Sequence, residues 1–237
     1  VAIAWVVFSV NLLGDRLRMK TCADDDGVFI RSLACRGEFG GLSAEVWPMS
    51  LVMLAAFDVV MIETVGVGQR EIDVSQMCDT TCFVAQPGSG DSIQFLKAGI
   101  LEVPHVLVVN KEDMGAVARR TLSELGTALG RPHTDGDWEV PVLSASATAG
   151  TGIEALADTL AAHGKVIRDS KRLHERRRGY AAQWLLKRLQ EEFGSHGITR
   201  LGGERAILER LAGDKLSLFQ QLEALRQPLL AEHQFPR

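Results

Sequence analysis

Five short apolar runs rich in valine and isoleucine constrain the fold of this 237-residue chain more than any other feature. They cover residues 1–8, 57–63, 81–86, 105–111 and 140–146. Their hydrophobicity is continuous rather than alternating, which is typical of strands buried on both faces of a parallel sheet. The amphipathic segments between them are long enough for helices that connect parallel strands. We therefore predict an α/β fold, with a parallel sheet covered by helices.

A different pattern starts near residue 165, after which no further β-rich run appears. Residues 169–193 predict one long helix with an apolar stripe. The stripe consists of Leu173, Tyr180, Trp184, Leu185, Leu189 and Phe193. A glycine-rich segment at 194–203 separates this helix from two shorter ones. We expect a sheet domain over residues 1–165 and an all-helical domain over residues 166–237.

Charge and composition name no nucleic-acid or membrane partner. The formal net charge is −4, and acidic residues are interspersed with the basic run at 171–178, so we expect a solvated helix face there. The longest apolar run, residues 51–62, is too short to span a bilayer, and no signal peptide is visible, which predicts a cytoplasmic protein. The four cysteines form no C-x-x-C pair, so we expect buried reduced thiols rather than a zinc site.

The motif Asn110-Lys111-Glu112-Asp113 follows the fourth apolar run. A carboxylate at position 113 can accept hydrogen bonds from the two N–H groups on one edge of guanine. Asn110 would brace the loop, and the alkyl stem of Lys111 would lie along the ring. Adenine lacks this pair of donors, so binding it would leave a buried carboxylate unpaired at a cost of about 1–3 kcal/mol. Taken alone, the short motif predicts a helix cap by Asp113 equally well.

The fifth apolar run ends in Ser146-Ala147, which a glycine turn follows. A backbone N–H in such a loop can bond the guanine carbonyl oxygen. In isolation the segment favours an ordinary strand-to-helix turn, but its place one strand and one helix after the Asn110 motif favours base recognition. Because ligands bind at the carboxyl ends of parallel strands, we expect Glu63, Asn110 and Ser146 at one edge of the sheet.

Glu63 ends the second apolar run and is followed by Thr-Val-Gly. An acid at this point can hold a Mg²⁺-bound water, and the Gly66 N–H can meet a γ-phosphate. Gln69 is then placed to orient an attacking water. Most GTPases carry Asp-x-x-Gly here, and the glutamate keeps the charge on a longer side chain.

Six segments, in order along the chain, resemble the MeaB/ArgK-type G proteins, the family that includes the methylmalonic aciduria type A proteins. The segments are residues 13–19, 29–43, 62–71, 86–102, 108–115 and 146–153. The resemblance implies a parallel-sheet, P-loop GTPase-like domain of the SIMIBI class, followed by a C-terminal helical dimerisation arm and hence a homodimer. It also implies GTP or GDP with Mg²⁺ as ligands. The implied role is a GTP-hydrolysing metallochaperone that assists cobalamin loading or protection of methylmalonyl-CoA mutase.

The same resemblance assigns roles that spacing alone does not. Asp15 matches an acidic residue near the metal and the phosphates, which implies a part in both catalysis and metal binding. Glu63 matches the acid that serves Mg²⁺. Residues 87–97 match a loop that couples the nucleotide state to the mutase, and Lys97 is its expected reporter.

Two departures from the family pattern concern the phosphate side of the site. The phosphate-binding loop G-x-x-x-x-G-K-[ST] is absent from the 237 residues, and the family's Asp-Pro-Ser-Ser segment is replaced by Val-Phe-Ser-Val at 7–10. The sequence also begins at Val1, inside an apolar run. These features predict an N-terminally incomplete domain, either a fragment or a degenerate copy.

Three functions stay open from the sequence: the GTP-hydrolysing chaperone, a nucleotide-independent scaffold that retains only the protein-binding surface, and a nickel-insertion GTPase of related fold. The last would require a Cys/His metal site, which the sequence does not display. A transport-linked ATPase or kinase is opposed by Asn110 and Asp113, because these residues select guanine.

We expect residues 1–237 alone to bind GTP weakly. Most of the triphosphate charge normally meets the phosphate-binding loop, and each charge-assisted hydrogen bond lost with it is worth about 1.5–3 kcal/mol. Calorimetric titrations with GTP and ATP, each with and without Mg²⁺, measure this. Adding a family-type N-terminal segment with its loop should restore Mg²⁺-dependent GTP binding. Tight GTP binding by residues 1–237 alone would contradict the expectation.

Overall fold

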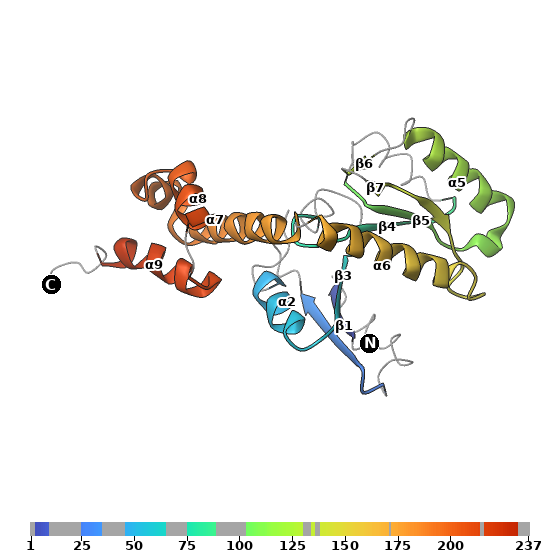
Figure 1. Cartoon of the computed structure of the whole chain (residues 1–237), viewed down its shortest axis with the longest axis horizontal. Coiled ribbons are helices and arrows are strands. Elements are labelled where there is room, and N and C mark those ends of the chain that lie inside the picture. Colours follow the sequence, from blue (N-terminus) through green and yellow to red (C-terminus); the bar gives the residue numbers. More distant parts are fainter. Residues whose placement is uncertain are drawn as a thin grey trace. The chain divides into compact units, whose positions relative to one another are not determined.

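The computed structural model describes residues 3–9, 25–34, 46–64, 75–88, 103–129, 134–135, 138–170, 172–213 and 216–231. The chain divides into two compact units, Val1–Arg172 and Leu173–Arg237. The boundary expected near residue 165 falls inside the helix α6 (Ile153–Asp169) of the first unit. Figure 1 shows the elements of each unit.

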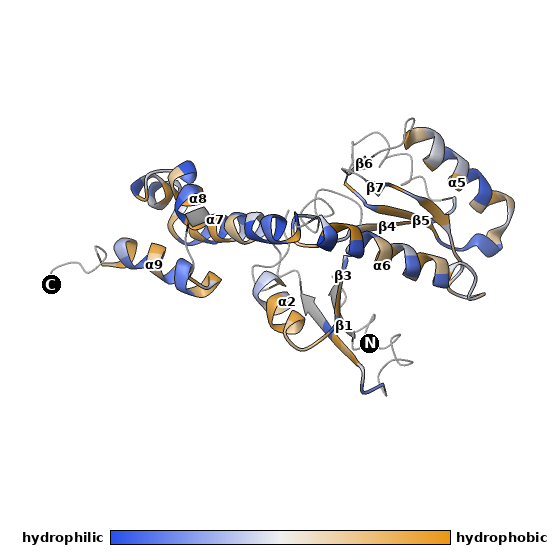
Figure 2. Cartoon of the chain, in the orientation of Figure 1, coloured by the Kyte–Doolittle hydropathy of each residue, from blue (hydrophilic) through white to orange (hydrophobic). Residues whose placement is uncertain are grey.

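One parallel sheet of the first unit contains β4 (Cys82–Ala85), β5 (Val106–Val109) and β8 (Val142–Ser144), in the order β4-β5-β8. All four residues of the central strand β5 are buried, as a continuous apolar run predicts. Figure 2 shows apolar colouring along β5. The three strands lie within the runs predicted from the sequence, and their parallel pairing confirms the predicted fold class.

Helices cover both faces of this sheet. In Figure 1, α5 (Ala116–Leu129) and α6 lie on opposite sides of it. Leu107 and Val109 belong to the same buried cluster as Ala118 and Leu125 of α5. Side chains alternate between the faces of a strand, so the buried residues Val106 and Val108 face the α6 side. The sheet is therefore a layer between two helices, as the pattern of the sequence predicts.

A second parallel sheet contains β1 (Ile3–Ser9), β2 (Val28–Ala34) and β3 (Val59–Thr64), in the order β2-β1-β3. The helix α2 (Val46–Leu54) and the β3 residues Val60 and Ile62 share one buried cluster. The sequence analysis missed β2, because Arg31 and Ser32 interrupt its hydrophobic run. Hydrophobic runs predict strands but not their pairing, so they did not reveal that the described ladders form two three-stranded sheets instead of one.

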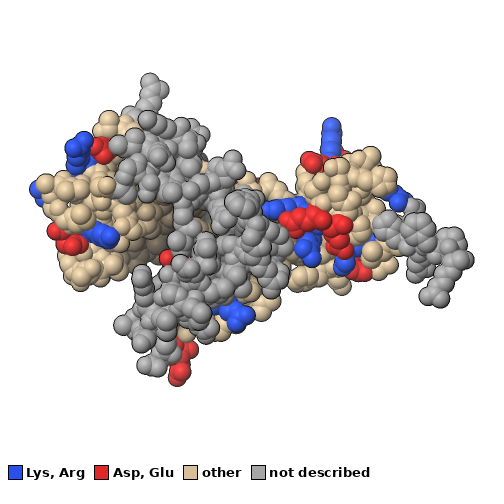
Figure 3. Space-filling view, turned by 180° about the vertical axis from the view of Figure 1, so that it is seen from behind, with Lys and Arg blue, Asp and Glu red and all other residues tan. Residues whose placement is uncertain are grey.

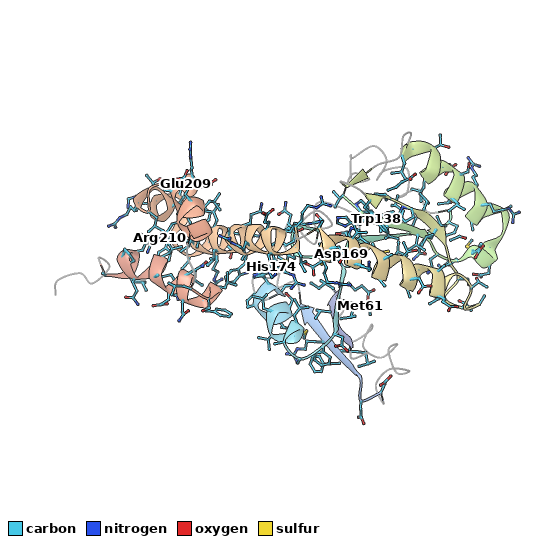
Figure 4. All side chains as sticks on the ribbon, viewed as in Figure 1. Met61, Trp138, Asp169, His174, Glu209 and Arg210 are labelled. Carbon is cyan, nitrogen blue, oxygen red and sulfur yellow. The ribbon has the colours of Figure 1, made fainter. Side chains whose placement is uncertain are left out.

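The short strands β6 (Thr134–Asp135) and β7 (Trp138–Glu139) pair in antiparallel fashion. They were not predicted, because two-residue strands carry no hydrophobic period. Trp138, labelled in Figure 4, donates its indole N–H to the backbone oxygen of His105, at 2.8 Å.

A buried polar cluster lies at the amino end of β5. His105 accepts a hydrogen bond at Nδ1 from the Thr81 N–H at 2.9 Å, and His163 Nδ1 lies 2.7 Å from the Thr80 hydroxyl. The two imidazole rings are 4.3 Å apart, and Trp138 meets the His163 ring edge-on at 5.0 Å. Both histidines are buried, and these contacts give each ring a hydrogen-bond partner at Nδ1. The cluster ties β7 and α6 to the start of β5.

The second unit consists of α7 (Arg172–Arg200, which begins at the last residue of the first unit), α8 (Glu204–Gly213) and α9 (Leu218–Leu230). Gly194 has φ 63° and ψ −171°, so it divides α7 into two helical segments at the break predicted from the sequence. The buried side chains of the unit are Trp184, Leu185, Leu189, Ile198, Ile207, Leu211, Leu225 and Leu229. Three members of the predicted apolar stripe are therefore in its core.

Charged side chains on this unit are paired rather than gathered by sign. Arg226 of α9 bonds Glu192 of α7 at 2.6 Å and Glu223 at 3.5 Å. On the side shown in Figure 3, acidic and basic residues lie next to one another. None of the helices in the described ranges combines the length and the apolarity that a membrane crossing needs.

Two glycines before α6 allow a controlled test of backbone fit. Gly150 and Gly152 have φ near +72° and +71°, where alanine costs about 1–2 kcal/mol. A Cβ at Gly152 would lie 2.2 Å from the Ser144 carbonyl oxygen, whereas one at Gly150 would meet nothing within 4 Å. Gly152→Ala should therefore lose about 1–3 kcal/mol more folding free energy than Gly150→Ala, from overpacking. Urea unfolding followed by circular dichroism measures both, and equal losses would show that the chain at Ser144 moves aside.

Candidate functional site

Two loops meet at the carboxyl ends of β5 and β8. The first runs from Asn110 through the short 3₁₀ helix η3 (Glu112–Met114), and the second follows Ser144. The Glu112 N–H donates to the Ala145 carbonyl at 3.0 Å, and the Ala145 N–H donates to Val109 at 2.9 Å. These backbone bonds extend the β5–β8 pairing into the loops and hold them side by side. This is the edge at which ligands bind in parallel sheets.

Asn110 braces both loops with a single oxygen. Its Oδ1 accepts the Lys111 N–H at 2.8 Å and the Ala147 N–H at 3.3 Å. A side-chain oxygen that accepts two backbone N–H groups fixes both segments of main chain at once. The structure thus places Asn110 in the bracing position that the motif predicts.

Asp113 and Ser146 are joined across the two loops. The Ser146 hydroxyl donates to Asp113 Oδ1 at 2.5 Å and accepts the Ala149 N–H at 3.1 Å. Ser146 is fully buried, and its N–H bonds the Thr151 carbonyl at 2.9 Å. Asp113 is exposed, and its Oδ2 has no hydrogen-bond partner among the described residues. The buried serine therefore fixes the orientation of the exposed Asp113 carboxylate.

Lys111 adopts an unusual backbone conformation between these two groups. Its φ of 58° and ψ of 44° are left-handed, and it is the one non-glycine residue with positive φ in the described part of the chain. Its Nζ donates to Gln86 Oε1 at 2.9 Å. Gln86 was not predicted as a site residue, although it is the last residue of the predicted run at 81–86.

A further contact between the loops was also missed from the sequence. The Thr151 hydroxyl donates to Glu112 Oε2 at 3.4 Å, and Ser146 and Thr151 form an isolated antiparallel bridge. The second loop is thereby folded back on itself beside the first. Glu112 occupies the variable position of the motif, directly before Asp113, so the motif gave no signal for it.

The predicted phosphate and metal groups are described only in part. Glu63 is exposed near the end of β3, and the strand register pairs it with Val7 of β1. Asp15, Gly66, Gln69 and Lys97 lie outside the described residues. Mg²⁺ usually takes one or two carboxylate ligands from a protein when phosphates complete its coordination shell, so a single carboxylate is enough here. Glu63 therefore suits the role predicted for it.

The described cysteines have the properties of inert thiols. Burial raises the pKa of Cys78 to about 12, with an added effect from the Asp79 charge, and burial raises the pKa of Cys82 to about 11. Neither forms a disulfide, and both stay protonated at neutral pH. Within the described ranges, no group of three or more His, Cys, Asp or Glu residues is placed to hold a metal ion.

Comparisons with known proteins identify relatives of this chain. A putative GTPase of Pyrococcus abyssi is 41% identical over 186 residues, which are 76% of this chain and 54% of the relative. GTPase ArgK of Escherichia coli is 32% identical over 225 residues, 92% of this chain and 67% of ArgK. A mitochondrial methylmalonic aciduria type A homolog of Caenorhabditis briggsae is 33% identical over 187 residues, 77% of this chain and 45% of that protein. The chain spans about half the length of curated relatives such as the two Pyrococcus proteins it matches.

A solved structure supports the fold. The crystal structure of HypB from Helicobacter pylori in complex with nickel matches with a TM-score of 0.50 and 17% identity, over 69% of this chain and 74% of that one. At this identity the likeness concerns the fold alone. The family model described as "Methylmalonyl Co-A mutase-associated GTPase MeaB" matches residues 8–200. Because this match covers most of the chain and agrees with the resemblance of the motifs, the chain belongs to the MeaB family of methylmalonyl-CoA mutase-associated GTPases.

Proposed function

We propose that this chain binds GTP and GDP, with the base held between its two loops, and that it serves as a GTP-hydrolysing chaperone of cobalamin-dependent methylmalonyl-CoA mutase. The observation that carries the proposal is the hydrogen bond from buried Ser146 to Asp113. This bond fixes Oδ1 of the exposed Asp113 carboxylate, and Oδ2 of the same carboxylate would face the base. Family membership supports the reaction and the partner.

The geometry suits guanine rather than adenine. Asp113 would accept the N–H and NH₂ groups on one edge of guanine. The N–H of Ala147, whose bond to Asn110 Oδ1 is long at 3.3 Å, would be shared with the guanine carbonyl. Adenine presents neither that pair of donors nor a carbonyl acceptor, so these protein groups would be left unpaired. Asn110 holds the Lys111 and Ala147 segments in place, and the Lys111 stem would cover one face of the ring.

The phosphate side of the proposed site rests on the family. Glu63 and Asp15 would hold Mg²⁺, whose chemistry when bound is to neutralise charge on the phosphate oxygens. The Gly66 N–H would meet the γ-phosphate, and Gln69 would orient the attacking water. Val7 stands where the family pattern has an acid, and the β1–β3 register sets it beside Glu63. Glu63 would therefore carry more of the metal-side charge in this chain.

The proposed location rests on the sequence, and the proposed partner and dimer rest on the family. We propose a cytoplasmic protein that binds the mutase as a homodimer through its helical unit. Four large apolar side chains of this unit are exposed in the single chain: Leu208, Leu216, Phe219 and Leu230. Exposed apolar groups on a small helical unit are suited to burial against a second copy. A scaffold that works without nucleotide is the alternative, and nucleotide binding separates the two.

Asp113→Asn should reverse the choice of base. An asparagine offers one oxygen and one NH₂, which matches xanthine better than guanine. In a version of the chain that carries a phosphate-binding loop, the variant should bind GTP about 5- to 150-fold more weakly, as loss of about 1–3 kcal/mol implies, and xanthosine triphosphate more tightly. Competition titration with a fluorescent GDP analogue measures both affinities.

Glu112→Gln is the matched control for this change. It removes a carboxylate one residue away, and Glu112 contacts Thr151 rather than Ser146. The Glu112→Gln variant should prefer guanine over xanthine to the same degree as the unmodified chain. Asp113 has no part in base recognition if both variants keep that preference.

Phe219→Asp should convert a homodimer to a monomer. Phe219 is 53% exposed, so an aspartate there is tolerated in the single chain but would be buried unpaired in an interface. Arg205→Asp, at an exposed arginine of α8, is the control and should leave the dimer intact. Light scattering after size-exclusion chromatography measures the mass. A monomeric mass for the unmodified chain at all concentrations would refute the proposed arm.

A further inference from the structure

Lys111 is held both at its backbone and at the ammonium group of its side chain. Its backbone N–H donates to Asn110 Oδ1 at 2.8 Å, and its Nζ donates to Gln86 Oε1 at 2.9 Å. A lysine side chain on a protein surface normally samples many rotamers, and ordering it costs free energy. A lysine fixed at its backbone and at its ammonium group instead holds its alkyl chain in one orientation.

The sheet explains why Gln86 reaches Lys111. The strands β4 and β5 pair in parallel with Ala85 opposite Val109, and the Asn110 N–H donates to the Ala85 carbonyl at 2.9 Å. Gln86 is therefore the first residue beyond β4 at the edge where the base loop leaves β5. The side-chain amide of Gln86 therefore reaches from the end of β4 to Lys111, beyond the end of β5.

The backbone of Lys111 points to a functional reason for this contact. A left-handed conformation is unfavourable for a lysine and persists only where its surroundings impose it, most often at ligand sites. Nothing in the fold of the loop requires a lysine there, because glycine or asparagine adopts this conformation more readily. The strained residue is also the one whose side chain is fixed by Gln86.

We propose that Gln86 is a positioning residue that sets the Lys111 stem against one face of the bound purine. The inference rests on the proposed guanine site and adds a residue from a neighbouring strand to it. The amide oxygen of Gln86 suits this role because it accepts a hydrogen bond from the Lys111 ammonium group and so fixes the end of the side chain.

A competing interpretation is that an exposed hydrogen bond of this kind has no consequence. Single surface contacts contribute little to stability, so unfolding experiments would not separate the two. Nucleotide binding separates them, because only a positioning role links Gln86 to the ligand through Lys111.

The test compares Gln86→Met, which keeps the length of the side chain and removes the acceptor, with Gln86→Glu, which keeps an acceptor. The probe is guanosine monophosphate at millimolar concentration, titrated into the 237-residue chain and followed by NMR. We expect Gln86→Met to weaken binding about fivefold, the equivalent of about 1 kcal/mol. Gln86→Glu should bind within about twofold of the unmodified chain on the same scale.

A double-mutant cycle with Lys111→Ala makes the result specific. In the Lys111→Ala background, Gln86→Met should have no further effect on binding. The proposal is overturned if Gln86→Met weakens binding equally in both backgrounds, or if it binds as tightly as the unmodified chain.

A ligand-free measurement keeps this test separate from the proposed function. In the chain labelled with ¹³C-lysine, the two Lys111 Hε protons should be inequivalent in the unmodified protein and in Gln86→Glu, and averaged in Gln86→Met. If the unmodified chain takes up no guanosine monophosphate, the proposed base site fails, and this spectrum still decides whether Gln86 fixes Lys111. Averaged Hε protons in the unmodified chain would overturn the inference.

Discussion

The candidate site depends on the burial of β5 on both faces. A strand with all four residues buried between α5 and α6 has a fixed register, because a shift by one residue would exchange the sides that its apolar groups face. The strand is also tied by the His105 cluster at its amino end and by the Ala145 N–H at its carboxyl end. The loop that begins at Asn110 therefore starts from a fixed point. A side chain on that loop can meet Ser146 on the next loop without a cost of ordering the backbone on binding.

The base-recognition groups all come from one continuous part of the chain. Gln86, Asn110, Asp113 and Ser146 follow the three strands of a single sheet, and each is held by a bond to a neighbouring strand end or loop. Glu63, the proposed metal-side residue, belongs to the sheet of β1, β2 and β3. The proposed base and phosphate groups therefore come from different sheets.

Much of this arrangement could be predicted from the sequence, because it follows from local patterns. Continuous apolar runs predicted the strands β5 and β8. The Asn110-Lys111-Glu112-Asp113 motif and the Ser146-Ala147 turn predicted that the loops after these strands lie at one edge of the sheet. Pairing depends on contacts between distant residues, so β2 was missed where Arg31 breaks the run, and the separate ladders were not foreseen. Gln86 was missed for a related reason. Its importance arises from the β4–β5 register, and that register is invisible in a single strand's composition.

The break at Gly194 has an electrostatic consequence for the helical unit. It ends the first segment of α7, so the carbonyl groups of its last turn point toward that end and give it a partial negative charge. Glu192 adds a full negative charge within the same turn, which on its own is unfavourable. Arg226 of α9 bonds Glu192 there at 2.6 Å, so its guanidinium offsets the carboxylate charge in this last turn. The kink thereby creates a local anionic site, and α9 supplies the cation that occupies it.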